Sequence, residues 1–211
     1  QMLLIRTLMV RFWNTPYANV RRVNLLLAKL PTTPLSASMQ SRVKGEAMFL
    51  RAWYYTQLMI AYGGVPIVGD KVYGKDDLIN LPRETFANTV KYISEELDKA
   101  AALLPAVYTD DIDYGRVTKG AAYALRGKAY LYMKKWAEAA ADFAQVKTAG
   151  YSLFANYNTL FKEINEQCDE MIFSMQNTGI DGLGSTTQWY CGTRSSFGSC
   201  WNTYLVSPTV V

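Results

Sequence analysis

Residues 46–68 read EAMFLRAWYYTQLMIAYGGVPIV and constrain the fold more than any other part of the chain. They predict a helix with apolar side chains around nearly its whole circumference, and such a helix is either buried in a protein or embedded in a membrane. Because Glu46 and Arg51 interrupt it well before the roughly 20 apolar residues of a membrane span, burial is the better interpretation. Gly63 ends the helix, and Pro66 keeps the chain extended after it. We therefore expect a central helix with other helices packed on both of its sides.

Apolar residues that recur at helical intervals predict further helices before and after this one. The expected segments are 1–13, 16–30, 41–61, 83–104, 119–133 and 136–150. The last two follow the tetratricopeptide pattern of large and small residues at fixed spacing. Gly127 and Ala139 are its small positions, which let two helices approach closely, although Arg126 stands where that pattern has a leucine. Because a helix pair cannot bury its apolar face alone, we expect an all-α, tetratricopeptide-like solenoid of about three stacked pairs.

Two segments fall outside the helical pattern. Residues 62–83 contain Gly and Pro with little periodicity, which predicts a long loop or lobe inserted between two helices. Residues 151–211 are rich in Asn, Thr, Ser and Gly, and only EMIFSMQ at 170–176 has the alternating apolar residues of a short strand. We therefore divide the chain into a helical region at 1–150 and an irregular, loop-rich region at 151–211.

Basic residues are concentrated at the start of the chain, whose net charge is +4. Those within residues 1–51 are Arg6, Arg11, Arg21, Arg22, Lys29, Arg42, Lys44 and Arg51, against the single acid Glu46. A basic region can bind nucleic acid or an acidic partner. These residues, however, are spread along helical patterns without a continuous basic run. We therefore interpret them as solvated helix faces and expect no nucleic-acid partner.

The types of residue present argue against catalysis. Histidine, the commonest general base and a usual zinc ligand, is absent from the sequence. No nucleophile-elbow, Walker or dinucleotide-binding motif occurs either. Asp110, Asp111 and Asp113 could bind Ca²⁺ or hydrolyse a glycoside, but the rest of a calcium loop is missing, so a solvated acidic loop is the preferred interpretation. We expect no catalytic residue, no metal site and no cofactor.

Aromatic side chains in loops are better candidates for function. A sugar presents an apolar CH face and a hydroxyl edge, so its site needs an exposed flat ring beside amides or carboxylates. Tyr73, for example, has Asp70, Asp76 and Asp77 near it in the sequence. The candidate ligand-binding residues chosen in this way are Tyr73, Tyr108, Tyr114, Trp189, Tyr190 and Trp201.

Cysteines occur only in the last quarter of the chain, as Cys168, Cys191 and Cys200. Cys191 and Cys200 are near enough in sequence for a disulfide that closes a loop, and free thiols are equally compatible with the spacing. The first residues contain neither a secretory signal nor a cysteine for lipid attachment, and Gln1 stands within an apolar, helix-like stretch. We therefore expect a processed or incomplete piece of a longer protein.

Separated blocks of residues form a recognisable series along the chain. The first block is the central helix and its stop, with Glu46, Ala47, Phe49, Leu50, Arg51, Ala52, Tyr54, Tyr55, Tyr62, Gly63, Val65 and Pro66. The second is a helix start followed by a tryptophan, with Gly115, Arg116, Thr118, Lys119, Gly120, Ala121 and Trp136. The last blocks hold Tyr151, Leu153, Asn156, Tyr157, Leu160, Phe161, Asn165, Glu170, Ile172, Phe173 and Ser174. In this order the chain resembles the first half of the SusD/RagB family, the surface nutrient-binding proteins of Gram-negative uptake systems.

The resemblance implies a non-enzymatic nutrient-binding lipoprotein on the outer-membrane surface. Such a protein would deliver an oligosaccharide, or a peptide in the RagB branch, to a SusC-like TonB-dependent transporter. Its solenoid would dock on the transporter, its irregular part would face the ligand, and its N-terminal lipid anchor would lie outside this chain. Two different functions stay open beside this one: a tetratricopeptide-type scaffold for protein–protein interaction, and a glycosidase that uses the aspartate-rich loop.

Overall fold

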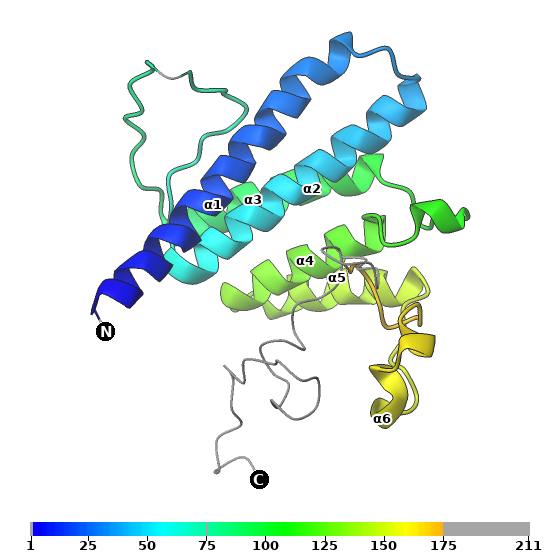
Figure 1. Cartoon of the computed structure of the whole chain (residues 1–211). Coiled ribbons are helices and arrows are strands. Elements are labelled where there is room, and N and C mark those ends of the chain that lie inside the picture. The colour runs from blue at the N-terminus through cyan, green and yellow to red at the C-terminus, as the bar shows by residue number, and fades with distance from the viewer. Residues whose placement is uncertain (1, 75, 175–211) are drawn as a thin grey trace, which may run out of the picture. The chain divides into compact units, whose positions relative to one another are not determined.

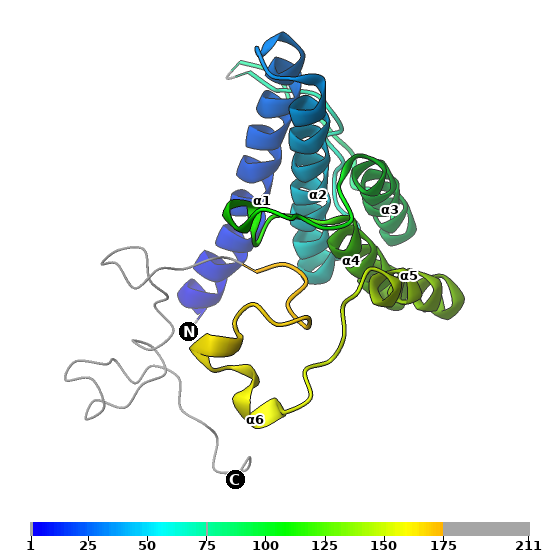
Figure 2. The same cartoon turned by 90° about the vertical axis from the view of Figure 1, so that its right-hand side faces the viewer.

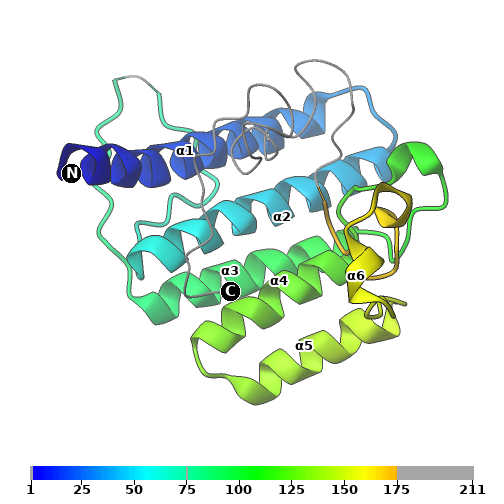
Figure 3. The same ribbon diagram turned by 60° about the horizontal axis from the view of Figure 1, so that its bottom comes forward.

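The computed structural model describes residues 2–74 and 76–174, and this part of the chain consists of helices joined by loops. The long helices follow one another, and each packs against the next one along the chain (Figures 1 and 3). They are α1 (Met2–Lys29), α2 (Ala37–Tyr62), α3 (Phe86–Leu103), α4 (Lys119–Tyr132) and α5 (Trp136–Thr148). Shorter helices are η1 (Leu30–Thr32), η2 (Asp111–Asp113), α6 (Tyr157–Leu160) and η3 (Glu163–Asn165). No strand occurs among the described residues, and the prediction of an all-α, solenoid-like fold is confirmed.

Helix α2 is the second helix of this row and lies between α1 and α3 (Figure 3). It begins after Ser36, whose hydroxyl accepts a hydrogen bond from a backbone amide in the first turn, and it ends at Gly63 with a φ of +74°. Tyr55 and Leu58 are fully buried, whereas Trp53 remains 37% exposed. The predicted burial between neighbouring helices is therefore confirmed, with one face of α2 left open. Among the described residues we find no helix that combines the length and the hydrophobicity of a membrane span.

Helix α1 differs from the prediction of two helices separated near Pro16, because the helix continues through this residue. Proline lacks an amide donor, so it removes one helical hydrogen bond and usually bends or ends a helix. Here the rings on either side of it pack against α2. The ring centroid of Trp13 lies 5.0 Å from that of Tyr62, and the centroid of Tyr17 lies 6.3 Å from that of Tyr55. We attribute the continuity of α1 to this packing.

Helices α4 and α5 approach closely at Gly127, as the tetratricopeptide pattern predicts. A Cβ atom at this position would stand 2.8 Å from a ring carbon of Phe143. Arg126, the departure from that pattern, has its partner on α5. Its Nε donates to a carboxylate oxygen of Asp142 at 2.8 Å, and Asp142 is only 4% exposed. An ion pair between the two helices therefore stands where the pattern has an apolar contact.

The described end of the chain differs from the strand predicted at 170–176. Residues 170–174 form turns and bends, and the remainder lies outside the described part. A strand needs a neighbouring strand for its backbone hydrogen bonds, and the described residues supply none. Phe173 instead packs edge-on against α2, with its ring centroid 5.4 Å from that of Phe49. Figure 2 shows the segment that leaves α5 and passes through α6. This segment belongs to the same compact unit as the helices. The division of the chain between residues 150 and 151 stays a prediction.

Candidate ligand-binding site

The chain between α2 and α3, residues 63–85, extends over α1 before it returns to α3 (Figures 1 and 3). We call these residues the crossover segment. Side chains of the helices hold its first half in place. Tyr17 on α1 donates its hydroxyl hydrogen to the carbonyl of Pro66 at 2.7 Å, and the hydroxyl of Tyr55 on α2 accepts a hydrogen bond from the amide of Val68 at 2.8 Å. The segment therefore forms a fixed wall beside α1.

A buried cluster of charged and polar side chains on the helices binds the crossover segment. Arg51 and Glu96 are each 1% exposed, and Arg51 Nε donates to a carboxylate oxygen of Glu96 at 2.7 Å. One terminal nitrogen of Arg51 also donates to Asp70 at 2.7 Å and to Asn24 at 2.8 Å. Asn24 in turn donates to the carbonyl of Gly69 at 2.8 Å. The interpretation of Arg51 as part of a solvated helix face was wrong, because this cation joins three helices to the crossover segment.

The two ends of the crossover segment lie against each other. The amide of Glu84 donates to the carbonyl of Val65 at 3.4 Å, and Arg83 Nε donates to the carbonyl of Gly64 at 2.7 Å. A Cβ atom at Gly64 would stand only 2.0 Å from the carbonyl oxygen of Glu84. The backbones can meet at this distance because Gly64 has no side chain.

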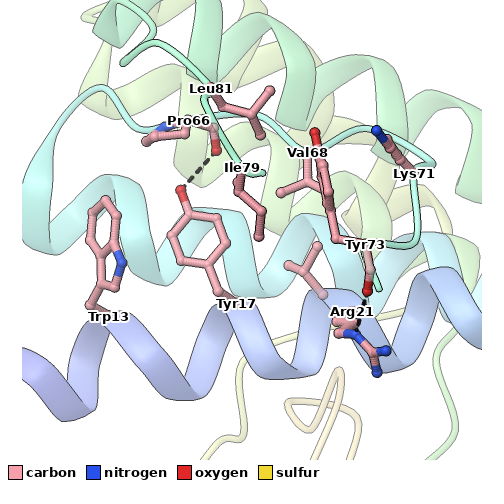
Figure 4. Close-up of a pocket in the computed structure, with 10 residues that line it drawn as sticks. Trp13, Tyr17, Arg21, Pro66, Val68, Lys71, Tyr73, Ile79 and Leu81 are labelled. Atoms are coloured by element: carbon pink, nitrogen blue, oxygen red, sulfur yellow. Dashed lines mark hydrogen bonds between the residues drawn. The ribbon is translucent and has the colours of Figure 1, made fainter. Parts of the chain in front are cut away.

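A cavity of about 370 Å³ lies between α1 and the crossover segment (Figure 4). Trp13 and Tyr17 stand on α1 with their ring centroids 5.0 Å apart, and Tyr73 lines the cavity from the crossover segment. The complete lining consists of Trp13, Tyr17, Val20, Arg21, Pro66, Val68, Lys71, Tyr73, Ile79 and Leu81. Flat rings on an otherwise apolar wall can hold the CH face of a sugar, so the geometry suits a small ligand with one apolar surface.

The charged groups at the Tyr73 end of this cavity are cations. Arg21 Nε donates to the backbone carbonyl of Tyr73 at 3.1 Å, and Lys71 Nζ lies 4.4 Å from the centroid of the Tyr73 ring. The sequence predicted carboxylates beside this ring. The structure differs, because Asp70 pairs with the buried arginine of α2 and Asp77 accepts a hydrogen bond from a backbone amide of its own loop. Neither aspartate lines the cavity.

Tyrosine hydroxyls in this framework are held in their neutral form. Burial, followed by the nearby hydroxyl of Tyr55, raises the pKa of Tyr17 above its usual value. Burial also raises the pKa of Tyr55 to about 12, against the opposing effects of the Val68 amide and the Arg51 cation. A pKa that is higher in the folded than in the unfolded state stabilises the fold only while the group stays protonated. This stabilisation is therefore complete below pH about 10 and is lost as the pH rises through about 12.

Alkaline pH is accordingly expected to destabilise the fold. Between pH about 9 and about 12, the free energy of unfolding should fall by about 2–3 kcal/mol through Tyr55 alone, because each unit of raised pKa corresponds to about 1.4 kcal/mol. Urea unfolding of the full-length protein at a series of pH values measures this change. Tyr55→Phe should show a shallower decline over the same interval. A free energy of unfolding that stays constant with pH in the parent protein would contradict the prediction.

The structure separates the candidate residues chosen from the sequence. Tyr73 lines the cavity beside α1. Tyr108 and Tyr114 line a second, more polar pocket of about 290 Å³ between the loop before α4 and the chain after α5. Their hydroxyls donate to backbone carbonyls at 3.2 and 3.1 Å, so these two rings also brace the loops. Cys168 is free, whereas Trp189, Tyr190, Cys191, Cys200 and Trp201 lie outside the described residues.

The acidic loop before α4 is partly built into the fold. A carboxylate oxygen of Asp113 accepts a hydrogen bond from Arg42 at 2.9 Å, and the other lies 2.6 Å from Arg116 Nε. The side chain of Asp113 is only 18% exposed. The interpretation of this loop as simply solvated was therefore wrong for Asp113, because two arginines neutralise its charge. Within the described residues, no cluster of acids and cysteines is arranged to hold a metal ion.

Sequence reasoning missed three cavity residues on α1, namely Trp13, Tyr17 and Arg21. It favours the core for rings on helices and a solvated face for the arginine. The three residues are spaced four apart and therefore share one face of the helix. The sequence pattern that could have pointed to these residues is two aromatic rings followed by a cation at this spacing.

Comparison with protein families decides the identity of the fold. Residues 6–131 match the SusD-like family, described as "Starch-binding associating with outer membrane". The chain belongs to the SusD-like family. The matched range contains α2, the crossover segment, α3 and all of α1 from Arg6 onward, so the whole cavity beside α1 lies within the family's shared region. The resemblance stated from the sequence motifs is confirmed.

Relatives of known structure share this SusD-like fold. A SusD-like protein from Bacteroides fragilis is 34% identical, with a TM-score of 0.76 over 82% of this chain and 34% of its own. A laminarin-binding SusD-like protein is 30% identical, with a TM-score of 0.74 over 80% of this chain and 38% of its own.

A curated relative was found by sequence. This SusD-like protein of Formosa agariphila is 24% identical over 196 residues, which are 89% of this chain and 35% of that protein. The chain thus spans about a third of the length of the curated relatives it matches.

Proposed function

We propose that this SusD-like chain is part of a non-enzymatic cell-surface protein that binds oligosaccharides. The observation that carries the proposal is the cavity beside α1, where Trp13, Tyr17 and Tyr73 present aromatic surface on opposing elements. Hydrogen bonds to α1 and α2 hold the crossover segment in place, so little ordering is needed when a ligand binds. Similar solved structures are named as laminarin-binding and carbohydrate-binding proteins, which supports a glycan as the ligand.

The proposal extends to location and partner. The protein would be held on the outer membrane by an N-terminal lipid anchor and would pass its ligand to a SusC-like TonB-dependent transporter. The family's description as starch-binding and associated with the outer membrane supports the location. A pull-down with the full-length protein from outer-membrane extracts should recover such a transporter. Recovery of soluble proteins alone would count against this partner.

Binding of a peptide, as in the RagB branch, is a second candidate within the same class of function. A glycan array and a peptide array with the full-length protein separate the two ligands. A tetratricopeptide-type scaffold has less support, because the crossover segment interrupts any regular repeat of helix pairs. A glycosidase also has less support, because the ion pairs of Asp113 with Arg42 and Arg116 engage a carboxylate that such an enzyme would need.

Removing the rings of the cavity is expected to weaken glycan binding by about tenfold to a hundredfold, the range typical of aromatic hot spots. The variants are Trp13→Ala and Tyr73→Ala in the full-length protein, measured by isothermal titration calorimetry with a glycan identified on the array. Tyr157→Ala is the matched control, because this ring is 73% exposed and lies outside the cavity. Thermal melting separates a binding defect from unfolding. Unchanged affinity in folded Trp13→Ala and Tyr73→Ala would contradict the proposed site.

A further inference from the structure

The cations at the Tyr73 end of the cavity lack acidic partners. Arg42, Arg51, Arg116 and Arg126 each pair with at least one carboxylate. Among the ion pairs of the described residues, Arg21 pairs with none, and the same holds for Lys71. Both side chains line the cavity. The nearby acids Asp70 and Asp77 are engaged elsewhere. The lining of the cavity therefore includes two exposed cations that form no ion pair within the described part of the chain.

The remaining lining gives a neutral sugar little to bind except aromatic surface. The residues around the rings are mostly aliphatic, and the hydroxyl of Tyr17 already donates to the Pro66 carbonyl. A neutral oligosaccharide would gain contact with the rings but few hydrogen bonds for its hydroxyl groups. An anionic substituent would gain a charge-assisted hydrogen bond from Arg21 or from Lys71, and such bonds are roughly twice as strong as neutral ones. The guanidinium fork of arginine suits the paired oxygens of carboxylate and sulfate groups.

We propose that the cavity selects acidic glycans, with a sugar ring held between the aromatic walls and a carboxylate or sulfate group at Arg21 or at Lys71. The inference rests on the proposed function, because it names the ligand class of the same site. Arg21 also fixes the backbone of Tyr73 through its Nε, so one side chain links the position of the ring to the position of the charge. Uronates and sulfated sugars share this chemistry and are separated by the experiment.

The test uses the full-length protein and two matched pairs of oligosaccharides. One pair is an oligogalacturonate and its neutral methyl ester; the other is a sulfated galactan oligosaccharide and its desulfated form. We expect at least one acidic member to bind about tenfold or more tightly than its neutral partner, as one or two hydrogen bonds to charged groups imply. This preference should shrink at high salt. Preference within the first pair identifies a uronate ligand, and preference within the second identifies a sulfated one.

Variants of the cavity show which side chains cause the preference for acidic over neutral oligosaccharides. Arg21→Gln combined with Lys71→Met should abolish the preference for the acidic ligand, so that the acidic and the neutral member of a pair bind with about equal affinity. Arg22→Gln is the matched control, because Arg22 neighbours Arg21 on α1 but does not line the cavity. Equal binding of acidic and neutral members, or no binding of either acidic probe, would overturn the inference. The proposed function is judged separately, by whether Trp13→Ala and Tyr73→Ala weaken binding of whichever glycan the protein holds.

Discussion

Replacing Arg51 by methionine is expected to lower the free energy of unfolding by about 3–5 kcal/mol, the usual effect of removing one partner from a buried ion pair. The variant leaves the carboxylate of Glu96 buried without its main cation and leaves Asn24 without its donor. Lys99 lies 3.3 Å from Glu96, but its side chain is 57% exposed, so it compensates for only part of the loss. Chemical denaturation of the full-length protein measures the change.

Two further variants make this prediction specific. Arg22→Met removes an exposed arginine from α1 and should change the free energy of unfolding by no more than about 0.5 kcal/mol. The double variant Arg51→Met, Glu96→Leu replaces the pair by apolar groups and should be more stable than Arg51→Met alone, because no unpaired charge stays buried. A single variant as stable as the parent protein would show that the cluster does not hold the helices and the crossover segment together.

Gly64→Ala has the second large expected effect, because the new Cβ atom would stand 2.0 Å from the carbonyl oxygen of Glu84 and 2.8 Å from the carbonyl carbon of Thr85. Both are backbone atoms, so one end of the crossover segment or the start of α3 must move. We expect a loss of about 1–3 kcal/mol, as for other overpacked sites. Thermal and denaturant unfolding measure it.

Gly74→Ala is the matched control within the same segment. A Cβ atom there would have no neighbour closer than 3.8 Å, so the free energy of unfolding should change by less than about 0.5 kcal/mol. Equal stability of the two variants would contradict the close contact between the ends of the crossover segment.

The helices could be predicted from the sequence where the pattern that indicates them depends only on residues close together in the chain. The periodicity of α3 and the small residue Gly127 between α4 and α5 depend on neighbours close in sequence, and the structure places both as expected. The predicted break of the helix near Pro16 was wrong, because the packing of α1 against α2 outweighs the loss of one hydrogen bond. The predicted strand was wrong at residues 170–174, because a strand requires a neighbouring strand and the sequence does not reveal whether one is present. In both cases tertiary contacts overrode the local pattern.

The candidate site was less predictable than the fold. Tyr73 could be found because it lies in a glycine-rich loop, where a ring is free to face a ligand. Trp13 and Tyr17 were harder to find, because a ring on a helix faces a cavity only after another segment has folded over it. The burial of Arg51 has the same origin, since Glu96 lies 45 positions further along the chain. Contacts between distant segments create the cavity.

A crystal structure of the full-length protein with a bound glycan would show directly whether the cavity beside α1 is the binding site. We expect a sugar ring to contact Trp13, Tyr17 or Tyr73 between α1 and the crossover segment, with the backbone of that segment unchanged. A glycan bound elsewhere, with this cavity closed or filled by another part of the protein, would contradict this expectation.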